Sequence, residues 1–355
     1  MLALAGSLAC ATGTTQTLQR LTAAPCGAAT AMDHGLEWFG PAIARDRDRL
    51  NAWCESVGPP LVVAPASARA FGRASARQAE PVASGDHRDL VVVTWNIHEG
   101  AGDIAGLIDA YRPADFVILV QEAMRDGESV PASFPASVRA PKREPGGAAR
   151  GSDIVAVAKE LGLWLAYVPS MRNGAEVRED RGNAILSTLP LTTPLAIELP
   201  WVSQRRVAIM ATIEAVAGDR LLPIRVVSAH FDNRPGRRQQ SESLSNWLKP
   251  YASEDVPLIV GGDLNTWFGA SEETVRQIDA VVPLARECGD RPTGRFRRRL
   301  DHLFATPMAS VTRRCEIPAK LGSDHHPVVM RLTYRASSGA ADGSPRRPDM
   351  PSPAR

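Results

Sequence analysis

The stretch VPLIVGGDLN (residues 256–265) is an apolar run that ends in two glycines, an aspartate and an asparagine. Short apolar runs bounded by glycine and rich in β-branched residues are typical of buried strands. An acidic side chain directly behind such a strand needs a polar partner. The stretch therefore predicts a strand that carries Asp263 and Asn265 out of the core to a polar site.

Two earlier stretches are built in the same way. DLVVVTWNIHEG (89–100) places Asn96 behind a valine-rich run, and DFVILVQEAMRD (115–126) places Glu122 behind another. Helical patterns separate several of these strands, and this alternation indicates an α/β domain. We expect a sandwich of two mixed sheets with helices outside, and strand ends that bring their polar groups together.

Composition and charge narrow the classes of protein only a little. The chain has 355 residues, and 41 basic against 39 acidic side chains give a net charge of +2, so overall charge names no partner. No apolar run reaches the roughly 20 residues that a membrane-crossing helix needs. The sequence thus predicts a protein without a transmembrane segment, and we expect a monomer.

The chain divides into four parts by composition. Residues 89–335 hold the strand and helix patterns, and residues 336–355 have the Pro, Ser and Gly content of a disordered tail. Residues 26–88 read as an N-terminal extension that ends in a linker, although the helical spacing around Trp53 suggests packing on the main domain. Residues 1–25 resemble a secretory or lipoprotein leader, or else are a disordered start with no role in export.

The cysteines bear on the same question of export. If Cys10 belongs to a lipoprotein leader, four cysteines remain, and an exported protein could pair Cys26 with Cys54 and Cys288 with Cys315. The alternative is four buried thiols in a cytoplasmic protein. We expect a periplasmic, lipid-anchored or secreted protein.

The polar residues at the predicted strand ends form a set with a common chemistry. Carboxylate and amide oxygens suit a hard cation, Mg²⁺ or also Mn²⁺, and histidines suit proton transfer near neutral pH. Together they indicate metal-assisted attack of water on a phosphate ester. Taken singly, Asp263 could cap a helix and Asn96 could serve a turn. The set comprises Asn96, Glu122, Asn183, His230, Asp263, Asn265, Asp301, Asp324 and His325.

The order of the motifs adds a family resemblance. The series TWNIH, VQE, RGNAILS, SAHFD, GGDLN, LDHLF and SDHHP resembles the endonuclease/exonuclease/phosphatase superfamily, the family of deoxyribonuclease I. Each motif alone is a weak signal, but the whole ordered series extends over residues 89–335. The resemblance implies a four-layered α/β/β/α sandwich and hydrolysis of a phosphoester.

The resemblance also implies a role for each matching residue. Glu122 would be the principal metal ligand, with Asn96 and Asp324 completing the metal site. The remaining residues would act on the substrate: His230 as an acid at the phosphate or leaving oxygen, His325 paired with Asp301, Asp263 and Asn265 holding the attacking water and a phosphate oxygen, and Asn183 lining the phosphate pocket.

Basic residues suggest which phosphoester is cleaved. Arginines crowd the stretch RPTGRFRRRLDHLF, and we expect Arg297 and Arg298, together with Arg125, to contact a phosphodiester of nucleic acid. A solvated basic loop is the alternative interpretation.

Two other functions stay open. A lipid phosphodiesterase or phosphatase, of the sphingomyelinase or phosphoinositide phosphatase type, would keep the same core. It ranks lower because no clustered aromatic loop is evident, and Trp267 and Phe268 could pack in the core. A catalytically inactive binding module would have lost site residues, and here all of them are present.

Overall fold

The computed structural model describes residues 17–21, 36–66, 89–132, 151–172, 177–217, 220–233 and 236–334. The predicted tail, most of the linker and most of the leader lie outside these residues, so their predicted states stay predictions. Within the predicted leader, residues Leu18–Arg20 form β1, a strand that pairs with β2.

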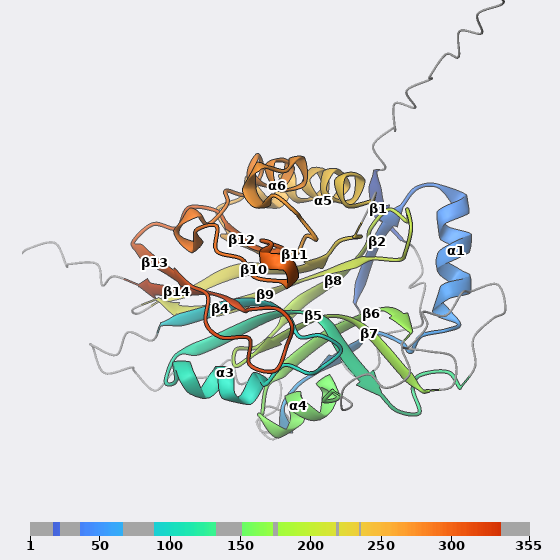
Figure 1. Cartoon of the computed structure of the whole chain (residues 1–355), viewed down its shortest axis with the longest axis horizontal. Helices are drawn as coiled ribbons and strands as arrows, with labels where there is room; N and C mark the ends of the chain where they lie inside the picture. Colours follow the sequence, from blue (N-terminus) through green and yellow to red (C-terminus); the bar gives the residue numbers. More distant parts are fainter. Residues whose placement is uncertain are drawn as a thin grey trace, which may run out of the picture.

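In the described part of the chain, the strands form two stacked seven-stranded sheets (Figure 1). The first sheet has the order β1-β2-β8-β9-β10-β11-β12, and the second has the order β13-β14-β4-β5-β7-β6-β3. The bounds in the first sheet are β2 Glu37–Pro41, β8 Thr192–Glu198, β9 Val207–Ala217, β10 Arg220–His230, β11 Leu258–Asp263 and β12 Asp301–Ala305. Those in the second are β13 Val311–Glu316, β14 Val328–Tyr334, β4 Leu90–Asn96, β5 Asp115–Asp126, β7 Glu179–Ser187, β6 Trp164–Arg172 and β3 Leu61–Val63.

Each sheet contains one parallel pair of neighbouring strands that ends in predicted site residues. These pairs are β10 with β11 and β4 with β5. Parallel strands end at the same edge of their sheet, which is where the open α/β sheets of other proteins bind ligands. His230 and Asp263 are register partners at the end of the first pair, and Asn96 and Gln121 are partners in the second.

Alternation along β4 shows how the sequence directs side chains to the two faces of its sheet. Leu90 and Val92 lie in the core between the sheets, whereas Val91 and Val93 belong to the core beneath the helices. A strand changes face at every residue. Asn96 therefore falls on the face toward the other sheet.

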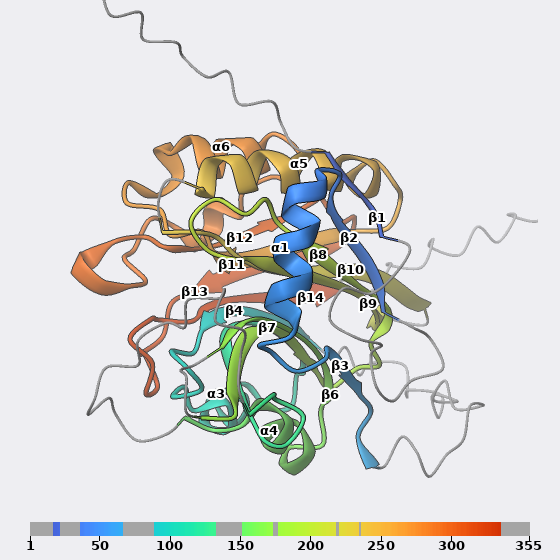
Figure 2. The ribbon, with the colours of Figure 1, turned by 90° about the vertical axis from the view of Figure 1, so that its right-hand side faces the viewer.

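Helices cover the two outer faces of the sandwich (Figures 1 and 2). α3 (Ile104–Tyr111) and α4 (Ile154–Glu160) bury apolar side chains against the second sheet, and α5 (Arg237–Ala252) and α6 (Glu273–Asp279) do so against the first. The predicted four-layered α/β/β/α sandwich is confirmed. Among the described helices, none is both long and apolar enough to cross a membrane.

The N-terminal extension is built into the sandwich. β2 pairs in parallel with β8, and β3 pairs antiparallel with β6, so this one segment contributes a strand to each sheet. Between them, α1 (Ala44–Cys54) runs along the side of both sheets (Figure 2). Its Trp53 packs against Met171 and Trp201.

The structure contains the disulfide Cys288–Cys315, as the cysteine count suggested. Cys54 is disulfide-bonded as well, and its predicted partner, Cys26, lies outside the described residues.

Candidate active site

A buried layer of polar side chains separates the apolar core from the strand ends that carry the predicted site residues. Gln121 Nε2 on the second sheet donates to Ser228 Oγ on the first at 3.0 Å, and Ser228 Oγ donates to the carbonyl of Val120 at 2.9 Å. A Cβ atom at Gly261 would lie 2.8 Å from Thr94 Cβ. The first glycine of GGDLN thus lets the two sheets approach closely below the site.

Above this layer a cavity of about 740 Å³ opens between the sheets. It collects most of the predicted site residues, from the ends of β4, β10 and β11, from a position inside β5 and from three loops. Those that line it are Asn96, Glu122, His230, Asp263, Asn265, Arg298, Asp324 and His325. Asp301, also predicted, reaches the cavity through His325.

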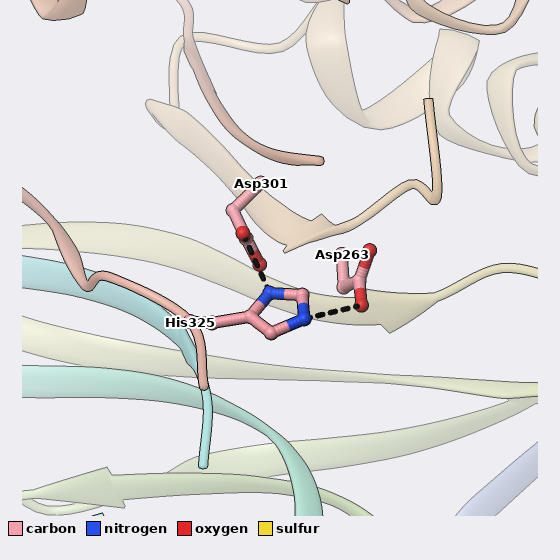
Figure 3. Close-up of side chains that lie close together, drawn as sticks. All are labelled: Asp263, Asp301 and His325. Atoms are coloured by element: carbon pink, nitrogen blue, oxygen red, sulfur yellow. Dashed lines mark hydrogen bonds and ion pairs between the residues drawn. The ribbon is translucent and has the colours of Figure 1, made fainter. Parts of the chain in front are cut away.

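Asp301, His325 and Asp263 form a buried relay (Figure 3). Asp301 Oδ2 lies 2.8 Å from His325 Nδ1, and His325 Nε2 lies 4.0 Å from Asp263 Oδ2. Burial opposes charge on the ring, but the hydrogen bond and charge of Asp301, with Asp263, raise the pKa of His325 to about 10. Burial and the neighbouring Asp301 raise the pKa of Asp263 to about 6, against the lowering effect of His325. This arrangement favours a protonated His325.

His230 is held in a different state. Arg206 Nη1 lies 3.0 Å from His230 Nδ1, and a guanidinium can only donate. The ring therefore accepts at Nδ1 and carries its proton on Nε2, which lies 3.5 Å from Asp263 Oδ2. Burial, together with Arg206 and Arg181, lowers the pKa of His230 well below its ordinary value. His230 is thus a neutral hydrogen-bond donor.

A β-bulge aims Glu122 into the cavity. The register between β5 and β7 shifts between Val120 and Ala123, which places one extra residue on β5, and Glu122 has φ of +53°. Burial would raise the pKa of Glu122, but the charges of Arg181, Arg206 and nearby imidazoles lower it. Its carboxylate stays ionised, 3.4 Å from Arg181 Nη1.

Asn96 and Asp324 also line the cavity, the first buried and the second partly exposed. Asn96 Nδ2 donates to Asp263 Oδ2 at 2.9 Å, which leaves Asn96 Oδ1 to face its own loop, where it accepts from the amide of His98 at 3.0 Å. Asp324 pairs with Arg295 at 2.7 Å and lies 3.4 Å from His98 Nδ1.

Two groups in the cavity could hold a cation. Asp263, Asp301 and His325 offer ligand atoms within 4.8 Å of one another. Their imidazole, however, is hydrogen-bonded to Asp301 and favours the protonated state, which offers no lone pair to a metal. Glu122, Asn96 and Asp324 present only oxygen donors, the set that Mg²⁺ prefers, and this second group fits the implied metal better.

Asn265 is shaped to serve the Asp263 carboxylate. It has φ of +52°, its amide donates to Asp263 Oδ1 at 2.9 Å, and its Nδ2 donates to the carbonyl of Phe231 at 2.8 Å. The turn thus fixes both polar side chains of GGDLN at the cavity wall.

Comparison with known proteins identifies the fold's relatives. The profile of the Endonuclease/Exonuclease/phosphatase family matches residues 93–325. The chain belongs to this family. Members of the family are hydrolases that act on phosphate esters. Among curated protein sequences, none matches this chain.

Solved structures of the family resemble the chain over its sandwich. An endonuclease/exonuclease/phosphatase from Beutenbergia cavernae is 22% identical, covers 70% of this chain and 72% of its own, and has a TM-score of 0.49. The human Nocturnin catalytic domain with bound sulfate is 19% identical, with coverage of 70% and 96% and a TM-score of 0.48. Truncated Caenorhabditis elegans TDP2 is 16% identical, with coverage of 69% and 97% and a TM-score of 0.46. Similarity at this level concerns the fold alone.

Three residues that were predicted to contact the substrate do not line the cavity. Arg125 is buried and paired with Asp180, with its guanidinium 4.9 Å from the ring of Tyr167. Asn183 is buried between the sheets, where its Nδ2 donates to the carbonyls of Val207 and Ser228 at 2.9 and 3.3 Å. Arg297 is exposed but does not line the cavity.

The bulge explains why Arg125 is misplaced in the prediction. An unbroken strand would put residues 121, 123 and 125 on one face. The extra residue at Glu122 reverses the alternation, so Arg125 lies on the helix-covered face with Tyr167. A one-residue shift in register moves every later side chain to the opposite face.

Several residues of the cavity were not predicted. The position of Arg181 in the cavity could not be predicted from the strand pattern, although Arg181 is the first residue of the RGNAILS motif. Arg206, directly before β9, does not line the cavity but contacts His230 from behind it, and the apolar run that follows gives no sign of this role. Other lining residues that were not assigned to the site include His98, Glu99 and Asp232. Asp232 organises the cavity wall, because its Oδ2 accepts from the amide of Ser203 at 3.1 Å.

The structure also corrects the expectation about aromatic side chains. Phe268 and Phe296 are 78% and 82% exposed, and Trp267 lines the cavity rather than the core. Two loops beside the active site therefore do present aromatic rings to solvent.

Proposed function

We propose that the protein is a metal-dependent phosphodiesterase that acts on nucleic acid. One observation carries the proposal: a single cavity is lined by Glu122, Asn96 and Asp324, whose oxygens suit a hard cation, and by His230 and His325, whose rings have an arginine and a carboxylate as their respective partners. Glu122, Asn96 and Asp324 would hold Mg²⁺, and the bound ion supplies stabilisation of the negative charge on the phosphoryl oxygens.

The residues of the chain divide the remaining work. Asp263 accepts a proton from the attacking water, and the Asn265 turn keeps its carboxylate in place. The water oxygen bonds to phosphorus while the bond from phosphorus to the leaving oxygen breaks. His230 donates a hydrogen bond from Nε2 to a phosphoryl oxygen. His325 gives its proton to the leaving oxygen, because Asp301 stabilises the protonated ring before the reaction.

This division differs from the roles that the resemblance implied, in which His230 was the acid. A neutral imidazole that accepts from Arg206 can donate a hydrogen bond but is a poor source of a proton. His325, paired with a carboxylate, is the better source.

Charge at the mouth of the cavity supports nucleic acid as the substrate. Arg295 and Arg298 both line the cavity, and their loop adds exposed Arg297 nearby. Cationic side chains beside a phosphate-cleaving centre bind polyanions by neutralising backbone phosphates. The exposed phenylalanines favour the second candidate, a phosphodiesterase of membrane lipids, which would use the same site residues.

The test compares substrates with the metal present and removed. Purified protein is assayed with Mg²⁺ or EDTA on plasmid DNA, single-stranded DNA, RNA, bis-p-nitrophenyl phosphate and sphingomyelin vesicles. We expect metal-dependent cleavage of nucleic acid that Glu122→Gln abolishes. The matched control is Glu128→Gln, which neutralises an exposed carboxylate outside the cavity. Cleavage of the lipid without cleavage of nucleic acid would overturn the proposed substrate, and full turnover by Glu122→Gln would overturn the proposed metal site.

A further inference from the structure

Two loops at the mouth of the cavity carry aromatic rings that packing does not explain. Among the described residues, the large hydrophobic side chains that are exposed are Ile43, Leu221, Phe268 and Phe296. The two phenylalanines are the most exposed of these, and they lie in residues 266–271 and 294–299. Burial of their rings does not stabilise the fold, so their placement calls for another explanation.

The rings are combined with a cation. The guanidinium of Arg298 lies 3.3 Å from the ring centroid of Trp267 and 5.4 Å from that of Phe296. Trp267, Phe296 and Arg298 all line the same cavity as Glu122 and Asp263. We call Trp267, Phe296 and Arg298 the aromatic rim. Phe268, in contrast, does not line the cavity.

The backbone holds the rim in place at some cost. Phe296 and Arg297 have φ values of +56° and +55°, a region that bulky residues rarely adopt. Such conformations are strained and concentrate at ligand-binding sites. Hydrogen bonds fix the loops around them: the amide of Leu264 donates to the carbonyl of Leu300 at 2.9 Å.

The first loop has its own support. The amide of Phe268 donates to Glu272 Oε1 at 2.7 Å, and Glu272 is paired with Arg237 at 2.7 Å. Glu272 therefore links this loop to Arg237 of α5, while Phe296 in the second loop stays exposed to solvent.

We propose that the aromatic rim is a subsite for an unpaired nucleobase next to the scissile phosphodiester. Aromatic and guanidinium planes bind unpaired bases by stacking, whatever the base. Arg295, which pairs with Asp324 in the same cavity, adds positive charge beside the phosphate position. The proposal rests on the proposed function and narrows it.

Duplex interiors do not fit this subsite. Both faces of a paired base are covered by its neighbours, so Phe296 can stack only on a base that has left the helix. The protein should therefore prefer single strands and frayed ends to internal sites of a duplex.

The experiment measures binding without cleavage. Fluorescence anisotropy in EDTA compares a labelled single-stranded 10-mer of thymidylate with a 10-mer of the same phosphates in which every base is replaced by an abasic tetrahydrofuran site. We expect the abasic strand to bind roughly tenfold more weakly, given the size of base–aromatic stacking. Phe296→Ala should remove that difference, Phe296→Tyr should keep it, and Phe268→Ala is the matched control that should keep it.

Each other outcome overturns the subsite. Equal affinity for both strands, or no binding of either, would show that the rim does not stack on bases. Equal losses with Phe296→Ala and Phe268→Ala, together with sedimentation on phosphatidylglycerol vesicles, would make the two phenylalanines a membrane contact. Failure of the proposed function would appear separately, as the absence of metal-dependent cleavage of any nucleic acid.

Discussion

The active-site cavity has two halves that are built differently. In the buried half, formed by His230, Asp263, Asp301 and His325, side chains are 0–8% exposed. In the open half, formed by Glu99, Glu122 and Asp324, they are 21–39% exposed. Close hydrogen bonds fix the buried half, whereas arginines balance the charge of the open half.

The difference indicates which half is arranged by folding and which half still has to rearrange when a metal ion binds. Folding alone orients the acid–base groups, since their partners are other buried side chains. The open carboxylates are paired with Arg181 and Arg295, which a divalent cation must displace or move aside. Substitutions in the buried half should therefore change the turnover rate. Substitutions in the open half should change the Mg²⁺ concentration that activity requires.

The largest effect should separate the two histidines. Glutamine keeps an N–H donor but cannot deliver a proton, so His325→Gln should lower turnover by about 10²–10⁴-fold. His230→Gln should retain much of the activity that His230→Ala loses, the latter by roughly 10²–10³-fold, the usual cost of removing one oriented donor. The measurement is turnover at saturating Mg²⁺. A loss with His230→Gln as deep as with His325→Gln would identify His230 as the acid.

A second prediction concerns stability and pH. Asp301, with Asp263 opposite, raises the pKa of His325 to about 10. A raised pKa in the folded state stabilises fully below the unfolded pKa, about 6.5, and the contribution is lost as pH rises toward 10. Asp301→Asn should therefore flatten the fall in unfolding temperature between pH 7 and pH 10.

Thermal unfolding in EDTA at several pH values checks this second prediction. The comparison with the unmodified protein removes the contribution of groups that titrate in both. Parallel curves for the two proteins would mean that the pair does not hold its proton in the folded state.

In the open half, Glu99→Gln should raise the Mg²⁺ concentration needed for half-maximal activity. Arg181 is shared between Glu99 and Glu122, and without the first carboxylate it competes more strongly with the ion for the second. Exposed ion pairs contribute up to about 1 kcal/mol, so a two- to fivefold change is expected, in a metal titration of turnover. An unchanged or lower half-saturating concentration would contradict this picture of the open half.

The smallest effect compares two neighbouring arginines. Arg298 lines the cavity and Arg297 does not, although both are cationic. Arg298→Ala should lower the salt dependence of nucleic-acid binding by about one unit of slope, and Arg297→Ala should lower it less. Binding is measured between 50 and 200 mM salt, about the range over which phosphate contacts weaken most visibly. Equal slopes for the two variants would remove the distinction between cavity wall and surrounding loop.

The sequence predicted the sandwich and most of the cavity because apolar runs that end in polar residues, and the family's motifs in their order, are strong signals. Asn96, His230 and Asp263 each end a strand at a position that alternation assigns to the face between the sheets. Arg125 was expected near the phosphate because it follows Glu122 closely and because the family often has a basic residue there, but the bulge at Glu122 turns it to the helix-covered face. No local pattern marks a bulge there, or tells that Asn183 binds carbonyls of the opposite sheet.

Arginines were the other gap. Arg206 and Arg181 act through neighbours on distant strands, so their roles depend on tertiary contacts rather than on spacing. The exposed rings of Phe268 and Phe296 were missed because hydrophobic residues are expected inside.

The strands of the N-terminal extension matter for anyone who trims this protein. The family match begins at residue 93, yet β2 covers the backbone edge of β8 and β3 covers that of β6. A fragment cut to the match would expose two rows of unpaired amides and carbonyls, the usual starting point of aggregation. It would also lose the amide of Gly58, which donates to Asp180 at 2.8 Å. The unit to transplant or crystallise is therefore larger than the unit that sequence comparison recognises.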